Sequence, residues 1–385
     1  MKKKHLIFWI GGAIIALILV IVLLLNMSKG SPYYGDDIVK SGEVTIGVTG
    51  NGSTLKNDTM FWQGIELAVD EINQNGGLKS KRLKIDYKDD QGKLVTGNAV
   101  ANSFVLNRNL LGVIGHVDSD ITVEASRVYN VGGKLLISPL STSDTITSLG
   151  YPYSFMNTLS NSQMAEQNVK SIVGAGKKKV AIFYEDSEYG RSLTNYFELY
   201  AKQYGIEVID RVSDYRSEAE FMQIFNKWSA LECDSVFVAH VMPRSEYFLR
   251  RIQTATKDLA IYCSEGAESA DIISRMGALA ENISVFTIFN PEIDRSQTRE
   301  FIDKFKAKYG KTPDTFAVHA YDSVKLIAAA SEKSDVLRAD YIAKVLKTQD
   351  FAFEGVAGRY SFDGKGNTIN MNFYMKTVKN GQYVY

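Results

Sequence analysis

Residues 178–212 read KKVAIFYEDSEYGRSLTNYFELYAKQYGIEVIDRV, and this stretch decides the fold class. Both of its ends, 178–186 and 206–212, are rich in β-branched and aromatic residues, which is typical of strands. The segment between them, 189–204, is predicted to be a helix. A strand, a helix and a second strand in this order form a right-handed βαβ unit with parallel strands. The stretch therefore predicts an α/β fold with a parallel sheet.

The same alternation extends on both sides of this unit. Further strands are predicted at 44–48, 82–90, 111–115, 134–138, 234–240, 259–266 and 282–289. Helices are predicted between them at 61–77, 93–107, 120–131, 161–174, 217–231, 243–256 and 268–277. These are too many units for one comfortable sheet, so we expect two doubly wound parallel sheets.

The C-terminal part breaks this pattern. After Pro291 come three helical segments, 296–309, 315–331 and 337–348, with no strand between them. Such helices cannot extend a βαβ series, so they are expected to return and complete an earlier domain. Short strands at 353–361 and 371–377 are predicted to end the chain.

Composition and motifs exclude several classes of function. The chain has 385 residues with 44 basic and 44 acidic side chains, a balance that argues against a nucleic-acid partner. The four histidines are scattered, and no GxSxG, HExxH or GxxxxGK[ST] motif occurs. The sequence therefore predicts neither an enzyme nor a metal site, and no cofactor.

The two cysteines are expected to be free. Cys233 begins one predicted strand and Cys263 ends the next, which places their Cα atoms about 15 Å apart in a parallel sheet. A disulfide needs a separation below about 7 Å.

The N-terminus is predicted to cross a membrane. Lys2, Lys3 and Lys4 precede an apolar run, 6–25, which has the length of a transmembrane helix. We therefore expect residues 1–30 to anchor the protein in the cell membrane, 31–42 to be a linker, and the remainder to lie on the extracytoplasmic side. A cleaved signal peptide is the alternative, because small residues at 28–30 offer a cleavage site.

Ligands of open α/β sheets bind beyond the carboxyl ends of the strands. Ser119 and Asp120 follow one such end and could cap the next helix or, with its free N–H groups, bind a carboxylate. The hydroxyl-rich loop 138–144 follows the next strand, while 185–190 and 263–266 bring acidic residues. These acidic residues suit either the dipole of a helix or a ligand ammonium.

Several motifs together resemble the branched-chain amino acid type of periplasmic binding protein, which serves ABC importers. They are GIELAVDEINQNGG (64–77), YKDDQG (87–92), GVIGHVDSD (112–120), LLISPLST (135–142), VAIFYEDSEYGRS (180–192), FIDKFKAKYGKTPDTFAVHAYDSVKLIAAA (301–330) and GRYSFDGKGN (358–367). The resemblance implies two lobes joined by three crossovers, which close on a ligand by a hinge. The first lobe would comprise 43–158 and 290–350, and the second 159–289 and 351–385.

The resemblance also implies roles for individual residues. Ser119 and Thr142 would bind the carboxylate of an α-amino acid, and the Leu140 carbonyl and Glu265 would bind its ammonium. The remaining implied ligand-binding residues are Ser141 and Tyr189.

The sequence departs from the family at the pocket for the ligand side chain. Val241, beside His240, replaces a tyrosine, and Asn57, with Trp62 nearby, replaces an aromatic residue. The identity of the amino acid is therefore left open. We expect delivery of an amino acid or similar zwitterion to ABC permease subunits; the alternative is a sensor domain that signals through a separate protein.

Overall fold

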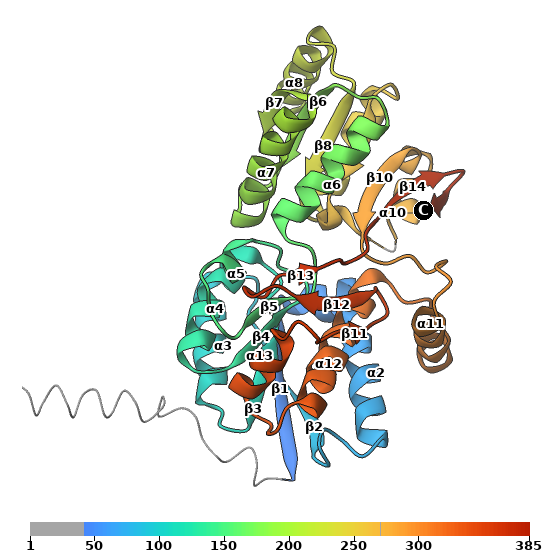
Figure 1. The fold of residues 1–385 in the computed structure, drawn as a ribbon. Helices are drawn as coiled ribbons and strands as arrows, with labels where there is room; N and C mark the ends of the chain where they lie inside the picture. The colour runs from blue at the N-terminus through green and yellow to red at the C-terminus, as the bar shows by residue number, and fades with distance from the viewer. Residues whose placement is uncertain (1–41, 270) are drawn as a thin grey trace, which may run out of the picture.

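The structure, a computed structural model, describes residues 42–269 and 271–385. Two α/β lobes lie end to end in it (Figure 1). The first contains a parallel sheet with the strand order β2-β1-β3-β4-β5. Its strands are β1 (Glu43–Gly50), β2 (Arg82–Asp89), β3 (Leu110–Ile114), β4 (Leu135–Ser138) and β5 (Ser154–Met156). Its first helices are the π-helical turn η2 (Thr54–Asp58), α2 (Phe61–Gln74), α3 (Leu94–Leu106), α4 (Ser119–Val131) and α5 (Thr145–Ser148).

The second lobe contains a sheet with the order β15-β14-β10-β9-β8-β6-β7. Strands β6 to β10 are parallel, whereas β14 and β15 are antiparallel additions at one edge. The strands are β6 (Lys179–Tyr184), β7 (Glu207–Val212), β8 (Ser235–Ala239), β9 (Ala260–Cys263), β10 (Ile283–Thr287), β14 (Tyr374–Lys379) and β15 (Gln382–Val384). The helices are α6 (Asn161–Gly174), α7 (Glu188–Tyr204), α8 (Glu218–Ala230), α9 (Arg244–Ala255), η3 (Glu265–Ala267), α10 (Ile272–Met276) and η4 (Gly277–Ala280). The prediction of an α/β fold with two parallel sheets is confirmed.

The three C-terminal helices lie against the first lobe. They are α11 (Ser296–Tyr309), α12 (Thr315–Lys333) and α13 (Ala339–Leu346). Helix α12 lies along α2 (Figure 1), and the two helices approach closely at Gly64, where a Cβ atom would stand 2.2 Å from the Ala317 carbonyl oxygen. Only glycine therefore allows this approach of the two helices. The contact fixes the start of α12 beside the end of the first sheet.

The last crossover differs from the expected one. Residues 353–369 form a small separate sheet of β11 (Phe353–Glu354), β12 (Arg359–Phe362) and β13 (Thr368–Ile369). This sheet lies over the first lobe (Figure 1), and Asn367 pairs with Met156 of β5. The expected second lobe included this segment, but only β14 and β15 join its sheet.

Asp322 of α12 fixes this segment to the first lobe. Its buried carboxylate accepts hydrogen bonds from the N–H groups of Val356 (2.9 Å) and Ala357 (3.0 Å) and from the Tyr360 hydroxyl (2.8 Å). The segment therefore follows these bonds rather than the strand pattern of the second sheet.

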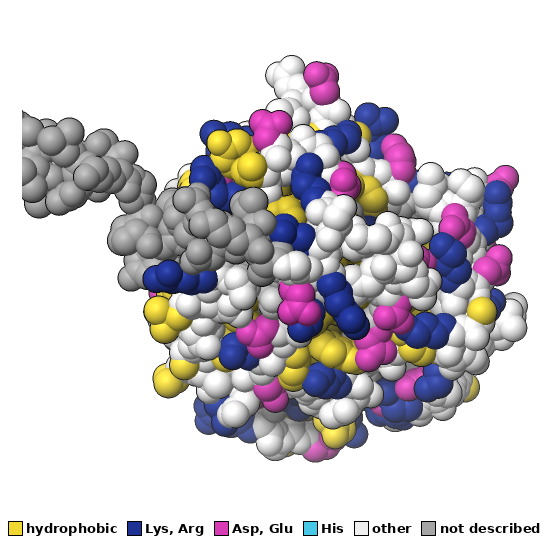
Figure 2. Space-filling view, turned by 90° about the horizontal axis from the view of Figure 1, so that it is seen from below, with side chains coloured by type: hydrophobic (Ala, Val, Ile, Leu, Met, Phe, Trp, Pro, Cys, Tyr) yellow, Lys and Arg dark blue, Asp and Glu magenta, His cyan; other side chains and the backbone are white. Residues whose placement is uncertain are grey.

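Cys233 and Cys263 are both free, as predicted. Figure 2 shows one face of the first lobe, on which basic and acidic side chains are intermixed. The predicted anchor and nearly all of the predicted linker lie outside the described residues. Within the described part of the chain, no helix has the length and apolar character needed to span a bilayer.

Candidate ligand-binding cleft

A cavity of ≈ 810 Å³ lies between the lobes. Both sheets direct the carboxyl ends of their parallel strands toward it, so the loops that follow these strands form its walls. The first lobe contributes loops after β1, β3 and β4 and the start of α12. The second lobe contributes loops after β6, β8 and β9. Among the described residues, no group of His, Cys, Asp and Glu side chains is arranged to hold a metal ion.

The wall of the first lobe presents a helix N-terminus. Ser119 is the first residue of α4, lines the cavity and is 4% exposed. Asp118 is the N-cap residue, but its side chain makes no capping hydrogen bond to the helix. The first N–H groups of α4 and the Ser119 hydroxyl can therefore bind an anion. Leu140, in the loop after β4, lines the same wall.

Two residues of this loop do not line the cavity. The buried Ser141 hydroxyl donates to the Val117 carbonyl (3.0 Å), which ties the β4 loop to the β3 loop. The Thr142 hydroxyl, also buried, donates to the Asn161 side chain at the start of α6 (2.7 Å). In this conformation both hydroxyls fix the loop rather than face the cavity.

The wall of the second lobe carries Tyr189 and Glu265. The Tyr189 hydroxyl donates to Ser264 (2.7 Å), and the residue is 7% exposed. Glu265 lines the cavity, and its buried Oε2 atom has no hydrogen-bond partner among the described residues. Burial raises the pKa of Glu265 to about 7, with the charge of Glu268 acting in the same direction. An acceptor of this kind favours an incoming positive charge.

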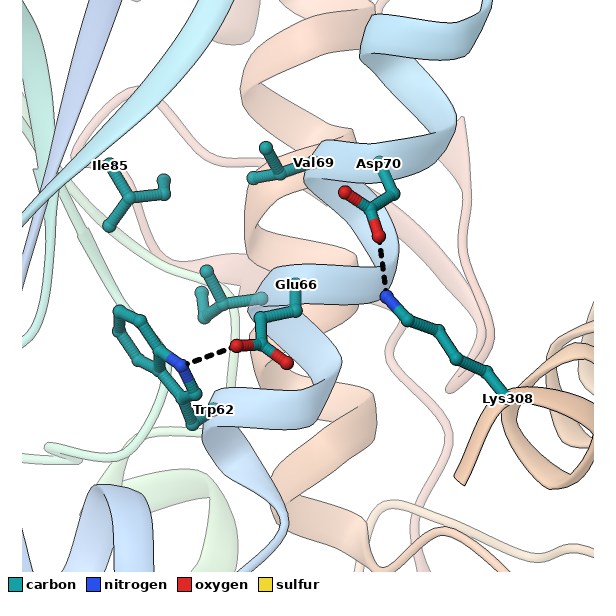
Figure 3. Close-up of a pocket in the computed structure, with 7 residues that line it drawn as sticks. Trp62, Glu66, Val69, Asp70, Ile85 and Lys308 are labelled. Atoms are coloured by element: carbon teal, nitrogen blue, oxygen red, sulfur yellow. Dashed lines mark hydrogen bonds and ion pairs between the residues drawn. The ribbon is translucent and has the colours of Figure 1, made fainter. Parts of the chain in front are cut away.

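The four residues expected around the ligand side chain divide into two pairs. Asn57 and Val241 line the cavity. His240 does not; its ring stacks on Phe183 at 5.5 Å between centroids. Trp62 lies in a separate surface hollow of ≈ 460 Å³, where its indole N–H donates to Glu66 at 2.8 Å (Figure 3).

Sequence reasoning did not identify three further polar residues of the cavity, Glu268, Thr315 and His319. Glu268 forms an ion pair with Lys376 of β14 through Oε1, and its Oε2 makes no hydrogen bond within residues 42–269 and 271–385. Thr315 and His319 lie on α12, and the buried Thr315 hydroxyl and His319 Nδ1 make no hydrogen bond to the part of the chain that the structure describes. Burial lowers the pKa of His319 to about 3, so its imidazole is neutral. The sequence offered only a weak signal for Thr315 and His319, because the pattern of α12 is that of a packing helix.

The lobes also touch beside the cavity. The Glu188 N–H at the start of α7 donates to Asp120 of α4 (3.2 Å), and the Ser143 hydroxyl donates to the Glu188 carboxylate (2.8 Å). These contacts lie next to the crossover into α6, so they fix the lobes on this side of the cleft.

Comparisons with known proteins agree with this architecture. Residues 43–382 match the family described as periplasmic binding protein. An ABC transporter substrate-binding protein from Desulfitobacterium hafniense, solved in complex with Leu, is 32% identical, with 89% of this chain and 99% of that chain covered and a TM-score of 0.81. A branched-chain amino acid transporter substrate-binding protein from Streptococcus pneumoniae, in complex with isoleucine, is 26% identical, with 89% and 97% covered and a TM-score of 0.78.

A leucine-, isoleucine-, valine-, threonine- and alanine-binding protein from Pseudomonas aeruginosa is 27% identical over 323 residues, which are 84% of this chain and 86% of that protein.

Proposed function

The chain belongs to the periplasmic binding protein family, and from that membership we propose that it is an extracytoplasmic protein that binds an amino acid or similar zwitterion. It binds this ligand without changing it chemically and delivers it to an ABC-type importer. The names of the similar proteins support this role, since they include substrate-binding proteins of ABC transporters.

The two walls of the cleft suit the two ends of an α-amino acid. The carboxylate binds the Ser119 hydroxyl and the N–H groups at the start of α4, which carry partial positive charge. The ammonium binds Glu265 and the carbonyl of Leu140. Charge-assisted hydrogen bonds of this kind contribute about 1.5–3 kcal/mol each. Together they select an amino acid over a molecule that has only one of the two charges.

One observation carries the proposal: the Glu265 carboxylate has a buried oxygen that accepts no hydrogen bond from any residue the structure describes, in a cavity whose opposite wall is the N-terminus of a helix. Ser141 and Thr142 support the site by holding the Leu140 loop in place. Tyr189 supports the Glu265 wall through its bond to Ser264.

The two lobes close around the ligand by a hinge at the crossovers, which lie near 158, 290 and 370. Residues 1–30 hold the protein at the membrane, with 31–42 as the linker. Such a tether raises the effective concentration of the binding domain near its permease.

Isothermal titration calorimetry of the full chain against the standard amino acids tests the proposal. At least one α-amino acid should bind, and its α-carboxamide and its deaminated analogue should each bind at least tenfold more weakly. The absence of binding by every α-amino acid would overturn the proposal.

A further inference from the structure

The charges that line the cleft are unbalanced. Among the described residues of its lining, Arg275 is the single lysine or arginine, and it is already paired with Glu246 (2.8 Å). The acidic residues of the lining are Asp58, Asp118, Asp120, Glu185, Glu246, Glu265, Glu268, Asp271 and Asp314.

Part of this excess has a structural role. Glu246 pairs with both Arg250 and Arg275, and Glu268 pairs with Lys376. Asp314 caps α12 by accepting the Ala317 N–H (2.8 Å). These bonds leave other carboxylates of the lining without a lysine or arginine partner in the described part of the chain, including Asp118, Glu185 and Glu265.

Asp118 and Glu185 belong to opposite lobes, and both line the cleft. Asp118 precedes α4 in the first lobe, and Glu185 follows β6 in the second. Burial raises the pKa of Asp118 to about 6, and the negative charges of Asp90, Glu185 and Asp120 act in the same direction. The nearest ionisable nitrogen to Glu185 is His240 Nδ1 at 3.7 Å, but burial lowers the pKa of this imidazole. Closure of the lobes would bring these two carboxylates closer together without a protein cation between them.

Buried atoms without partners also point to a ligand. The Glu268 side chain is 6% exposed and lines the cavity, yet its Oε2 makes no hydrogen bond within the described residues. The Oε2 atoms of Glu185 and Glu265 are also buried and make no hydrogen bond within the described residues, although the Glu185 side chain as a whole is 30% exposed. A single α-ammonium can bind Glu265 and its neighbour Glu268, but it leaves Glu185, which follows a different strand, unneutralised.

The remaining lining suits an aliphatic stem. Leu140, Met164, Val241, Phe286 and Phe316 all line the cleft. They can pack against methylene groups that lead away from the α-carbon, in the way that long basic side chains bury their stems.

We propose that the ligand is an amino acid with a second cationic group on its side chain, and that Asp118 of the first lobe and Glu185 of the second bind this group between them. The inference rests on the proposed function, because it assumes that Glu265 and the start of α4 hold the α-ammonium and the carboxylate. The side-chain cation neutralises both facing carboxylates, and the cleft closes on it.

Calorimetry of the full chain with paired ligands tests this proposal. L-Arginine is compared with L-citrulline, which has nearly the same shape but a neutral side chain, and L-lysine with L-norleucine. Each basic member should bind at least tenfold more tightly than its neutral partner. Asp118→Asn and Glu185→Gln should each weaken arginine binding at least tenfold and leave citrulline binding nearly unchanged, which also shows that the variants fold.

Asp186→Asn is the matched control, because Asp186 is adjacent to Glu185 but pairs with Arg191 on the surface and does not line the cleft. This variant should retain the preference for arginine. Equal affinity for arginine and citrulline, or tighter binding of leucine than of arginine, would overturn this inference and leave the proposed function intact. Binding of putrescine as tight as that of lysine would overturn the inference too. Putrescine is a diamine without a carboxylate, so such binding would show that the cleft does not recognise the α-carboxylate of the ligand. If no α-amino acid binds, the proposed function itself fails.

Discussion

Replacement of Glu265 by glutamine should weaken the ligand and stabilise the ligand-free protein at the same time. Glutamine keeps the shape of the side chain but removes the charge that meets the ammonium. The lost charge-assisted bond corresponds to about 2 kcal/mol, or roughly a thirtyfold increase in Kd.

The stabilising effect follows from burial. The folded state raises the pKa of Glu265 to about 7, so above that pH it holds an ionised carboxylate that burial disfavours. A shift of this size from the ordinary value of 4.5 corresponds to about 3 kcal/mol. The wild type is therefore destabilised as the pH rises from 4.5 through 7, because folding then holds a buried carboxylate that ionises readily in the unfolded chain. Glutamine does not ionise, so the variant should be more stable than the wild type at pH 8.

Two assays separate these effects: calorimetry with the amino acid that binds tightest, and thermal denaturation at pH 8 without ligand. A surface carboxylate paired with an arginine provides the control, since Asp186→Asn should leave affinity nearly unchanged. Unchanged affinity in the Glu265 variant would show that this residue does not bind the ligand. A Tm lower than that of the wild type at pH 8 would refute the account of its burial.

Three further predictions concern the fold and its pH dependence. Asp322→Ala should lower the free energy of unfolding by about 3 kcal/mol, because it leaves two buried N–H groups and a buried tyrosine hydroxyl without an acceptor. Urea denaturation measures this loss, and a value below about 1 kcal/mol would contradict the prediction. Gly64→Ala should destabilise the first lobe by roughly 1–3 kcal/mol through its clash with the Ala317 carbonyl. Gly174→Ala, where a Cβ meets no atom within 4 Å, should be nearly neutral or stabilising in the same assay. Finally, the Tm of the ligand-free wild type should fall between pH 5 and pH 8 through the titration of Glu265, and a slope that Glu265→Gln leaves unaltered would contradict this assignment.

The sequence predicted the parts of the fold that depend on periodicity. The unit β6–α7–β7 was recognised because strand and helix patterns alternate over long segments, and the return of α11, α12 and α13 followed from the lack of strands between them. Strand β5 was missed because a strand of three residues, all buried, is too short to show an alternating pattern. The placement of 353–369 was missed because it depends on hydrogen bonds to Asp322, which no local pattern records.

The candidate site shows the same limit. Residues next to strand ends, such as Ser119 and Glu265, could be named because the edge of a parallel sheet is fixed by topology. The orientation of a side chain could not be predicted. Trp62 lies in a separate surface hollow, and Thr142 donates its hydroxyl to Asn161. His319, by contrast, lines the cavity from α12, far along the chain from the loops that follow the strands of the first lobe.

The most direct test of the account is a crystal structure with the tightest-binding amino acid. We expect the α-carboxylate of the ligand within hydrogen-bond distance of the Ser119 hydroxyl and the first N–H groups of α4, and its ammonium against the Glu265 carboxylate. A ligand bound in the reverse orientation, or outside the space between the lobes, would contradict it.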